Sequence, residues 1–283
     1  MSGWRRELRC MSGSGKSFFK KINRKHPWLK FAILVSVVAV VVMVVMGEMS
    51  ANRGSLMGVN IIAPMQQHVK VTDRPIRVLR GKKLVALTFD DGPGVNTTPR
   101  LLDILYSKGA VATFFELGTN ARSNPEIVKR VINEGHELGS HTMYHQNLGN
   151  MSAGKVISDV NEAKAVFQGI IGDTPKVMRP PYGAVSDNMT KIIDVPMILW
   201  TVDTLDWKSR NRDEIVKQIR EGVFDGAIVL MHDIYEPTVD AVAVVIDALR
   251  GEGYEFVTVS EMAKTMGITM KNGGVYGSFR PKK

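Results

Sequence analysis

Short apolar runs alternate with amphipathic segments between residues 82 and 262. The runs are three to five residues long and are bounded by polar or turn-forming residues, which is typical of buried strands. They are 84–87, 111–115, 198–200, 227–230 and 256–259. Between them, apolar residues recur three or four positions apart, which is typical of helices that bury one face. This alternation predicts a parallel sheet covered by helices, either open or closed into a barrel.

The amphipathic segments carry helix start signals. Pro125 follows Asn124, and proline fits the first turn of a helix. Ser152 precedes a longer segment, and Asn211 with a glutamate three residues later resembles a capping box. Thr238 begins a fourth segment, which runs to residue 249. We therefore expect helices that begin near residues 125, 153, 212 and 238.

One apolar run is much longer than these strands. Residues 31–47 contain only Ser36 as a mildly polar interruption, and the run counted from Trp28 has 20 residues. A helix of that length spans about 30 Å, which is enough to cross a bilayer. The run predicts a single transmembrane helix, because it has no polar face. A cleaved signal peptide is the alternative, which the long basic segment before the run disfavours.

Positive charge is concentrated at the amino-terminal end. The net charge of the chain is +9, and residues 1–30 contain nine Lys and Arg against one Glu, a net of +8. The positive-inside rule therefore places residues 1–30 in the cytoplasm and the chain after the run outside the cell. Residues 31–263 have a net charge of about −4, so the composition gives no support for nucleic-acid binding by the folded part.

These patterns divide the chain into five parts. They are a basic cytoplasmic head (1–30), a membrane anchor (31–47), a stalk without clear periodicity (48–80), a domain of alternating strands and helices (81–266) and a basic tail (267–283). The tail is rich in Gly and Lys, and we expect it to be poorly ordered. Cys10, the only cysteine, lies in the head, so the exported part can form no disulfide. The sequence indicates no protein partner.

Asp90 and Asp91 follow the first strand-like run and precede Gly92-Pro93, which turns the chain. Functional sites of α/β proteins lie at the carboxyl ends of parallel strands, because the following loops meet there. Adjacent side chains of a regular strand point to opposite faces, so both aspartates can serve one site only where the strand breaks up. A solvated turn is the alternative for this segment alone.

His141 and His145 are four positions apart, which places them on one face if their segment is helical. With a carboxylate from Asp90 or Asp91 they would offer two nitrogens and one oxygen to a metal ion. Such a site leaves a position open for water, as catalytic metal sites do. Zinc, cobalt, nickel, manganese and iron all suit these ligands. A pair of polar surface residues is the alternative for the histidines alone.

Three further motifs follow apolar stretches. In 179–182, Arg-Pro-Pro-Tyr, two prolines stiffen the backbone, so the N–H of Tyr182 could be held as an oxyanion donor. Asp206-Trp207 and Leu230-Met-His232 follow two more strand-like runs. Each motif alone has an ordinary alternative: a Pro-Gly loop, a helix cap beside a core tryptophan, or a buried imidazole. Because they all follow strands, we expect their side chains to converge on one face of the sheet.

In this combination the chain resembles the polysaccharide deacetylase family, also called the NodB-homology domain or carbohydrate esterase family 4. Five motifs carry the resemblance in order, at 88–93, 141–145, 179–182, 206–207 and 230–232. The resemblance covers residues 84–262. It implies a distorted (β/α) barrel with fewer than eight strands, here preceded by the transmembrane helix. It also implies a metal-dependent polysaccharide N-deacetylase, a hydrolase that acts on carbon–nitrogen bonds other than peptide bonds.

The resemblance implies roles for the residues of the first three motifs. Asp91, His141 and His145 would hold one divalent metal ion, most often zinc in the family, with cobalt, nickel or manganese as alternatives. Asp90 would be the general base that acts on the attacking water, and Arg179 would pair with it.

The remaining roles concern the leaving group and the acetyl group. The resemblance implies that His232 is the general acid and that Asp206 orients it and adjusts its pKa. Trp207 and Leu230 would wall the pocket for the acetyl methyl group. The backbone N–H of Tyr182 would stabilise the oxyanion together with the metal.

These inferences favour a membrane-anchored enzyme that removes N-acetyl groups from amino sugars of a cell-wall polysaccharide and releases acetate. Peptidoglycan N-acetylglucosamine is the favoured substrate, because an exported domain on a short stalk faces the wall. N-acetylmuramic acid, chitin-type or poly-N-acetylglucosamine chains and O-acetyl xylan stay open. A catalytically silent glycan-binding domain is the alternative from another class. A phosphatase of the haloacid dehalogenase type is disfavoured, since its two aspartates are separated by one residue.

Overall fold

The computed structural model describes residue 79 and residues 81–280. The predicted head, anchor and stalk, residues 1–30, 31–47 and 48–80, lie outside this part apart from Leu79. None of the helices between residues 81 and 280 combines the length and the apolar character that crossing a bilayer requires.

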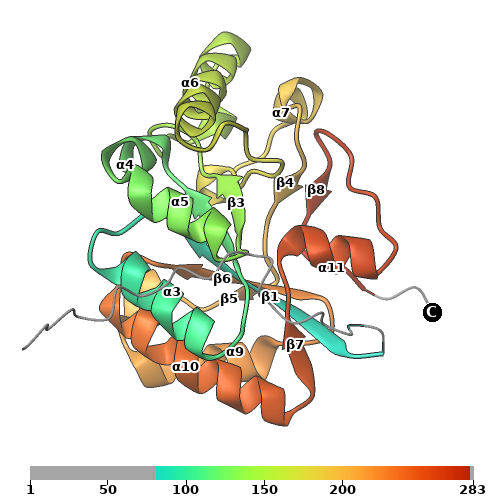
Figure 1. Ribbon diagram of the computed structural model, residues 1–283. Coiled ribbons are helices and arrows are strands. Elements are labelled where there is room, and N and C mark those ends of the chain that lie inside the picture. Colours follow the sequence, from blue (N-terminus) through green and yellow to red (C-terminus); the bar gives the residue numbers. More distant parts are fainter. Residues whose placement is uncertain (1–78, 80, 281–283) are drawn as a thin grey trace, which may run out of the picture. The chain divides into compact units, whose positions relative to one another are not determined.

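Parallel strands form the centre of the described part (Figure 1). β1 (Lys83–Asp90) pairs along one edge with β6 (Ala227–His232). Along its other edge it pairs first with β7 (Tyr254–Phe256) and then with β2 (Thr113–Glu116). Beyond these, β2 pairs with β3 (Glu137–Ser140) and β6 pairs with β5 (Val202–Asp203), all in parallel. The α/β fold with a parallel sheet therefore agrees with the sequence prediction.

Single bridges at Met178 join β3, one outer strand of this sheet, to the short strand β4 (Met197–Ile198). Met178 bridges Ser140 at the end of β3 and Met197 in β4, which leads along the chain into β5. The N–H of Arg179 donates to the Ser140 carbonyl at 2.9 Å, and the N–H of Ile198 donates to the Met178 carbonyl at 2.8 Å. The path from β1 through β2, β3, Met178, β4, β5 and β6 thus returns to β1, which makes an irregular barrel.

Helices cover the barrel in two groups, which Figure 1 shows on different sides. The first group packs over β1 and β6 and contains α3 (Thr97–Ser107), α9 (Arg212–Gly222) and α10 (Glu236–Gly251). The second group contains α4 (Gly118–Ser123), α5 (Pro125–Asn133) and α6 (Ala153–Ile171). Three short helices complete the set between residues 81 and 280: α7 (Asp187–Ile192), α8 (Asp206–Ser209) and α11 (Val259–Thr265). Single 3-10 turns lie at Leu148–Asn150 and Pro181–Gly183.

The starts of three predicted helices match the structure. The helices begin at residues 125, 153 and 212, and the Asn211 side chain accepts from the N–H groups of Asp213 and Glu214 at 2.9 and 3.1 Å. The fourth begins at Glu236, two residues before the predicted start. Its first turn includes Pro237, so the helix starts where proline is tolerated rather than at Thr238.

Alternation along β1 separates two apolar layers and determines where the site lies. Val85, Leu87 and Phe89 pack into the cluster that contains α3 and α10 side chains. Leu84 and Ala86 pack into a second cluster, with residues of β2, β4 and β6, inside the barrel. Successive side chains of a strand alternate between faces, so Thr88 and Asp90 continue the inner face of β1. The strand thus directs Asp90 into the barrel at its carboxyl end.

The carboxyl-terminal region differs from the sequence prediction in two places. The run 256–259 was predicted as a strand, but β7 ends at Phe256 and Thr258 caps α11. Thr258 and Glu261 form a reciprocal capping box there, so local hydrogen bonding overrides the β-branched composition.

The tail is ordered through residue 280, beyond the predicted domain end at residue 266. β8 (Val275–Tyr276) pairs with β4, and Ser278 bridges Ala227 at the start of β6. Phe279 is 1% exposed and packs in the inner cluster. Burial of one aromatic side chain explains why this Gly- and Lys-rich segment is fixed.

Candidate active site

The motif residues lie at the carboxyl ends of the barrel strands or in the segments that follow them, and these segments have an unusual backbone. Six non-glycine residues of the described part have a positive φ, and all of them lie in these segments: Asp91, Thr142, His145, Tyr182, Leu205 and Arg210. Such conformations cost on the order of 1–3 kcal/mol each, so they persist only where the surroundings impose them. Their concentration at one end of the barrel marks this end as the candidate functional site.

The aspartate pair separates at the end of β1, as the sequence predicted. Asp90 is the last residue of the strand and is 3% exposed, whereas Asp91 has a φ of 73° and lies beyond the strand. The left-handed turn at Asp91 rotates its side chain away from the regular alternation. Both carboxylates therefore face the same site.

Asp91, His141 and His145 form a cluster whose ligand atoms all lie within 4.8 Å of one another. Asp91 Oδ1 is 3.5 Å from His141 Nε2 and 3.3 Å from His145 Nε2. This oxygen is buried and has no hydrogen-bond partner among the described residues. A buried, unpartnered carboxylate oxygen beside two imidazole nitrogens fits a divalent metal ion, so the predicted ligands are compatible with the metal that the resemblance implies.

The two histidines reach this cluster from a loop and not from one face of a helix. Residues 141–147 form no helix, and Thr142 and His145 have φ values of 73° and 56°. The helical arrangement considered from the four-residue spacing is therefore wrong, although both rings arrive at the same point. Two left-handed residues bend the loop enough to bring the ring centroids to 5.0 Å.

His141 is held as a neutral ligand. Its Nδ1 lies 2.7 Å from the carbonyl oxygen of Arg179. A carbonyl only accepts hydrogen bonds, so Nδ1 carries the proton and Nε2 presents its lone pair to the cluster. Burial lowers the pKa of His141 to about 3, which keeps the imidazole in the uncharged form that binds metals.

Arg179 is fully buried and links His141 to Asp90. Its Nη1 donates to Asp90 Oδ1 at 2.7 Å and to the Thr88 hydroxyl at 2.8 Å, and its guanidinium lies 4.3 Å from the centroid of the Phe115 ring. Burial raises the pKa of Asp90, and the positive charge of Arg179 opposes this shift. Asp90 Oδ2 is left to face the cluster, 3.8 Å from His141 Nε2.

His232 and Asp206 form a second pair across the site. His232 Nδ1 is 2.7 Å from Asp206 Oδ1, and the backbone N–H of His232 donates to Asp206 Oδ2 at 2.8 Å. The N–H of Trp207 and the hydroxyl of Thr238 complete the contacts of this fully buried carboxylate. Burial alone would lower the pKa of His232, but the hydrogen bond and charge of Asp206 raise it to about 9.

The predicted pocket residues lie around these pairs. The Tyr182 ring packs against His145 with centroids 4.8 Å apart and is 68% exposed. Tyr182 N–H takes no part in the hydrogen bonds of its turn, which come from Gly183 and Ala184. Trp207 is 49% exposed beside Asp206, and Leu230 is two residues before His232 on the inner face of β6. Their contact with an acetyl group stays a prediction.

The sequence reasoning missed two buried carboxyl groups behind the aspartate loop, Glu116 and Asp233. Both are at most 1% exposed, and three of their four oxygens have no hydrogen-bond partner among the described residues. The hydroxyl of Thr98 donates to the fourth. Burial and nearby carboxylates raise the pKa of Glu116 well above its ordinary value and that of Asp233 to about 7. Asp233 directly follows a motif residue and Glu116 ends β2, so strand-end position was the available signal.

These carboxyl groups explain the glycine at position 92. A Cβ atom there would overlap the carboxylate of Asp233 and lie 2.6 Å from Glu116 Oε2. Only a residue without a side chain lets the Asp91 loop pack directly against the two acids. The segment that positions one metal ligand is thus in contact with the residue that follows His232.

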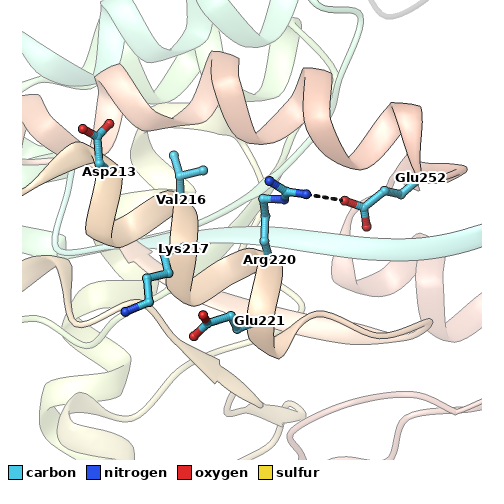
Figure 2. Close-up of a pocket in the computed structure, with 6 residues that line it drawn as sticks. All are labelled: Asp213, Val216, Lys217, Arg220, Glu221 and Glu252. Atoms are coloured by element: carbon cyan, nitrogen blue, oxygen red, sulfur yellow. Dashed lines mark hydrogen bonds and ion pairs between the residues drawn. The ribbon is translucent and has the colours of Figure 1, made fainter.

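A surface hollow of about 530 Å³ lies elsewhere, along α9 (Figure 2). It is lined by Asp213, Val216, Lys217, Arg220, Glu221 and Glu252. Its charges are mixed, Arg220 pairs with Glu252 at 3.4 Å, and none of its residues belongs to a motif. The hollow is a solvated helix surface and offers no converging catalytic groups.

Comparison with known proteins connects this geometry to a family. The family model described as polysaccharide deacetylase matches residues 78–194. The peptidoglycan-N-acetylglucosamine deacetylase PgdA of Listeria monocytogenes is 44% identical over 195 residues, which cover 69% of this chain and 41% of that protein. The chain thus spans less than half the length of that relative.

Two further matches cover nearly the whole of the other protein. A peptidoglycan-N-acetylglucosamine deacetylase of Bacillus cereus is 37% identical over 195 residues, which are 66% of this chain and 91% of that protein. The structure of a family 4 acetyl xylan esterase from Clostridium thermocellum, in complex with a cobalt ion, has a TM-score of 0.66 and 34% identity, and the match covers 69% of this chain and 98% of the esterase. The chain therefore belongs to the polysaccharide deacetylase family, carbohydrate esterase family 4, as its five motifs predicted.

Proposed function

We propose that this protein is a metal-dependent hydrolase that removes N-acetyl groups from peptidoglycan N-acetylglucosamine and releases acetate. One observation carries the proposal. An unpartnered Asp91 oxygen and two imidazole nitrogens converge between a buried Asp90–Arg179 pair and the His232–Asp206 pair. Hydrolysis of an amide needs an activated water, a stabilised oxyanion and a proton for the amine, and these groups can supply all three.

The proposed metal ion is zinc, with cobalt, nickel or manganese as alternatives. When bound by Asp91, His141 and His145, such an ion would polarise the acetyl carbonyl and make water a stronger nucleophile near neutral pH. The cobalt ion in the related esterase structure supports a divalent ion in the family.

Asp90 is suited to take the proton of the attacking water. Arg179 donates to Asp90 Oδ1 and orients the carboxylate from one side, and Asp90 Oδ2 faces the cluster. As the water oxygen bonds to the acetyl carbon, its proton moves to this oxygen. The N–H of Tyr182 can donate to the developing oxyanion.

His232 is suited to protonate the leaving amine. With Nδ1 bonded to Asp206, its Nε2 carries a proton that it can give to the sugar nitrogen as the carbon–nitrogen bond breaks. A pKa of about 9 keeps this group charged at neutral pH. The products are acetate and a sugar with a free amine.

The substrate and the location form the second part of the proposal. Two relatives that are 44% and 37% identical carry the name peptidoglycan-N-acetylglucosamine deacetylase, which supports the same polymer here. We further propose that residues 31–47 anchor the protein in the cell membrane as a single span, with residues 1–30 in the cytoplasm and the barrel outside.

Acetate release tests the reaction. The detergent-solubilised full chain is incubated with peptidoglycan, N-acetylglucosamine oligomers or O-acetyl xylan, before and after chelation and with zinc restored. We expect metal-dependent release from peptidoglycan. Release from xylan alone would overturn the N-deacetylase assignment, and release from the oligomers alone would replace the proposed polymer.

The Asp90→Asn variant is the matched control for a binding role. It keeps the shape of the side chain but removes the base, so acetate release should fall about 10²- to 10⁴-fold while metal and glycan binding persist. Equal acetate release by the variant and the parent would remove Asp90 from the mechanism.

A further inference from the structure

Arg210 is held in a defined position at the end of α8. Its backbone is left-handed, with a φ of 47°. Its Nε donates to the carbonyl oxygen of Trp207 at 3.0 Å, and its guanidinium lies 3.2 Å from the centroid of the Tyr235 ring. A guanidinium stacked on an aromatic ring and tethered through Nε keeps its outer N–H groups in a fixed plane.

This guanidinium lies at the edge of the candidate active site. The Tyr235 ring that it covers is 5.7 Å from the ring of His232, measured between centroids. Trp207, to which it is bonded, follows Asp206. Arg210 therefore belongs to the wall on the His232 side of the site, one aromatic ring away from the proposed general acid.

The charge of Arg210 is not neutralised by the described part of the chain. No salt bridge joins it to a described Asp or Glu, although neighbouring arginines are paired. Arg212 bonds Asp213 at 2.7 Å, and Arg220 lies 3.4 Å from Glu252. Arg210 is exposed, so a group in solution can reach it.

The interior of the site holds two cations that are each paired with a carboxylate, Arg179 with Asp90 and His232 with Asp206. Asp90, Asp91 and Asp206 lie in it, and the cation Arg179 is fully buried behind Asp90. The guanidinium of Arg210 has no such partner within residues 81–280 and lies at the rim of the site, outside the reacting centre. It can therefore attract a negatively charged substituent of a bound polymer. Arginine is the side chain best suited to bind a carboxylate with two parallel hydrogen bonds.

We propose that Arg210 binds a carboxylate carried by the sugar next to the one that is deacetylated, and that it thereby selects acidic wall glycan over neutral chitin-type chains. The inference rests on the proposed function and specifies its substrate class. In peptidoglycan this carboxylate has two sources, the lactyl group of the neighbouring sugar and the peptide attached to it. Both present the same chemistry to the guanidinium.

The test compares four oligosaccharides of equal length. One is a neutral N-acetylglucosamine tetramer. The other three alternate N-acetylglucosamine with N-acetylmuramic acid and carry a free lactyl carboxylate, a lactyl carboxamide or an attached peptide. For the full chain, kcat and KM of acetate release are measured on each. We expect the parent to favour the substrates that carry a carboxylate over the carboxamide, and the substrate that shows the preference identifies the source.

Arg210→Gln removes the charge, and Arg210→Lys keeps it without the planar fork. We expect Arg210→Gln to reduce the ratio of kcat/KM for acidic over carboxamide substrate about five- to tenfold, mainly through KM. Arg210→Lys should recover part of that ratio. Arg212→Gln is the matched control, because it removes one positive charge two residues away and should keep the parental ratio.

Three outcomes would overturn the inference. They are an unchanged ratio in Arg210→Gln, an equal fall of kcat on all four substrates in that variant, as loss of a structural residue would give, and an equal fall of the ratio in Arg212→Gln. Binding of the acidic and carboxamide tetrasaccharides to Asp90→Asn, with and without Arg210→Gln, measures the same selectivity without turnover. Absence of acetate from every substrate would instead contradict the proposed function, and the binding arm would still decide the role of Arg210.

Discussion

Two histidines in the same site have opposite protonation states, and the difference shows how this fold assigns chemistry. His141 and His232 both lie at carboxyl ends of barrel strands and are largely buried. The pKa of His141 falls to about 3, whereas that of His232 rises to about 9. Burial lowers both values, so burial alone does not distinguish them.

The hydrogen-bond partner of Nδ1 is the largest influence that raises the pKa of His232, and His141 has no charged partner there. His141 donates to a neutral carbonyl, that of Arg179, which orients the ring but adds little to the stability of its charged form. His232 donates to the carboxylate of Asp206, whose charge stabilises the imidazolium. The cluster of Asp91, His141 and His145 therefore receives a lone pair from His141, and the His232–Asp206 pair offers a proton.

The largest effect on acetate release should come from loss of the proposed metal site, which Asp91, His141 and His145 form. Asp91→Ala deletes the ligand oxygen that has no other partner, and chelation removes the ion. Either change should reduce acetate release to the background rate, and added zinc should restore the chelated parent but not the variant. Metal content by elemental analysis checks the cause. Full activity in the metal-free parent would contradict the proposed role of this cluster.

The next largest effect should come from removing the proton donor alone. His232→Gln leaves Asp91, His141 and His145 in place, so the variant should bind metal like the parent while kcat falls about 10²- to 10⁴-fold. Together with Asp91→Ala, this variant tests whether metal binding and proton donation can be lost independently of each other. Loss of metal from His232→Gln would show that they cannot.

A smaller and more specific effect is expected from Asp206→Asn. Without the carboxylate, only the charges of Asp90 and Asp91 oppose the effect of burial on the pKa of His232, so the basic limb of the pH–rate profile should move from near 9 toward lower pH. A limb that stays near 9 would mean that another group titrates.

The same variant changes the pH dependence of stability. In the parent the raised pKa of His232 adds stability that is complete below pH 6.5 and is lost as the pH rises through about 9. Asp206→Asn should lack this decline in the free energy of unfolding between pH 6.5 and 9. Chemical denaturation of both proteins across that range measures it.

The smallest effect is expected from a change at Gly92, where the Asp91 loop packs against Asp233 and Glu116. Gly92→Ala places a methyl group against the carboxyl groups of Asp233 and Glu116, which should cost about 1–3 kcal/mol of stability. Gly154→Ala is the control, because its Cβ would meet no atom within 4 Å and helix α6 favours alanine. Equal melting temperatures for Gly92→Ala and the parent would show that the side chains of Asp233 and Glu116 move aside at little cost in stability.

Local patterns predicted much of the fold and all of the motif residues at the site. Strand alternation places Asp90 on the inner face of β1, and a proline and an asparagine mark the starts of α5 and α9. Each of these depends on residues within about four positions. The loop path of His141 and His145, the acid pair of Glu116 and Asp233 and the order of the tail did not follow from such patterns.

What the sequence determined by itself is the alternation of strands and helices, the identity of the chemical groups and, as a prediction outside the described residues, the membrane anchor. The tertiary structure decided which groups face one another and in which charge state. Asp90 meets Arg179 across 89 residues, and His232 meets Asp206 across 26. Electrostatic energies depend on distance in space and on burial, which are not encoded in spacing along the chain. Two identical imidazoles therefore differ in charge state, and suit the proposed roles of metal ligand and proton donor, only because the barrel brings different partners to them.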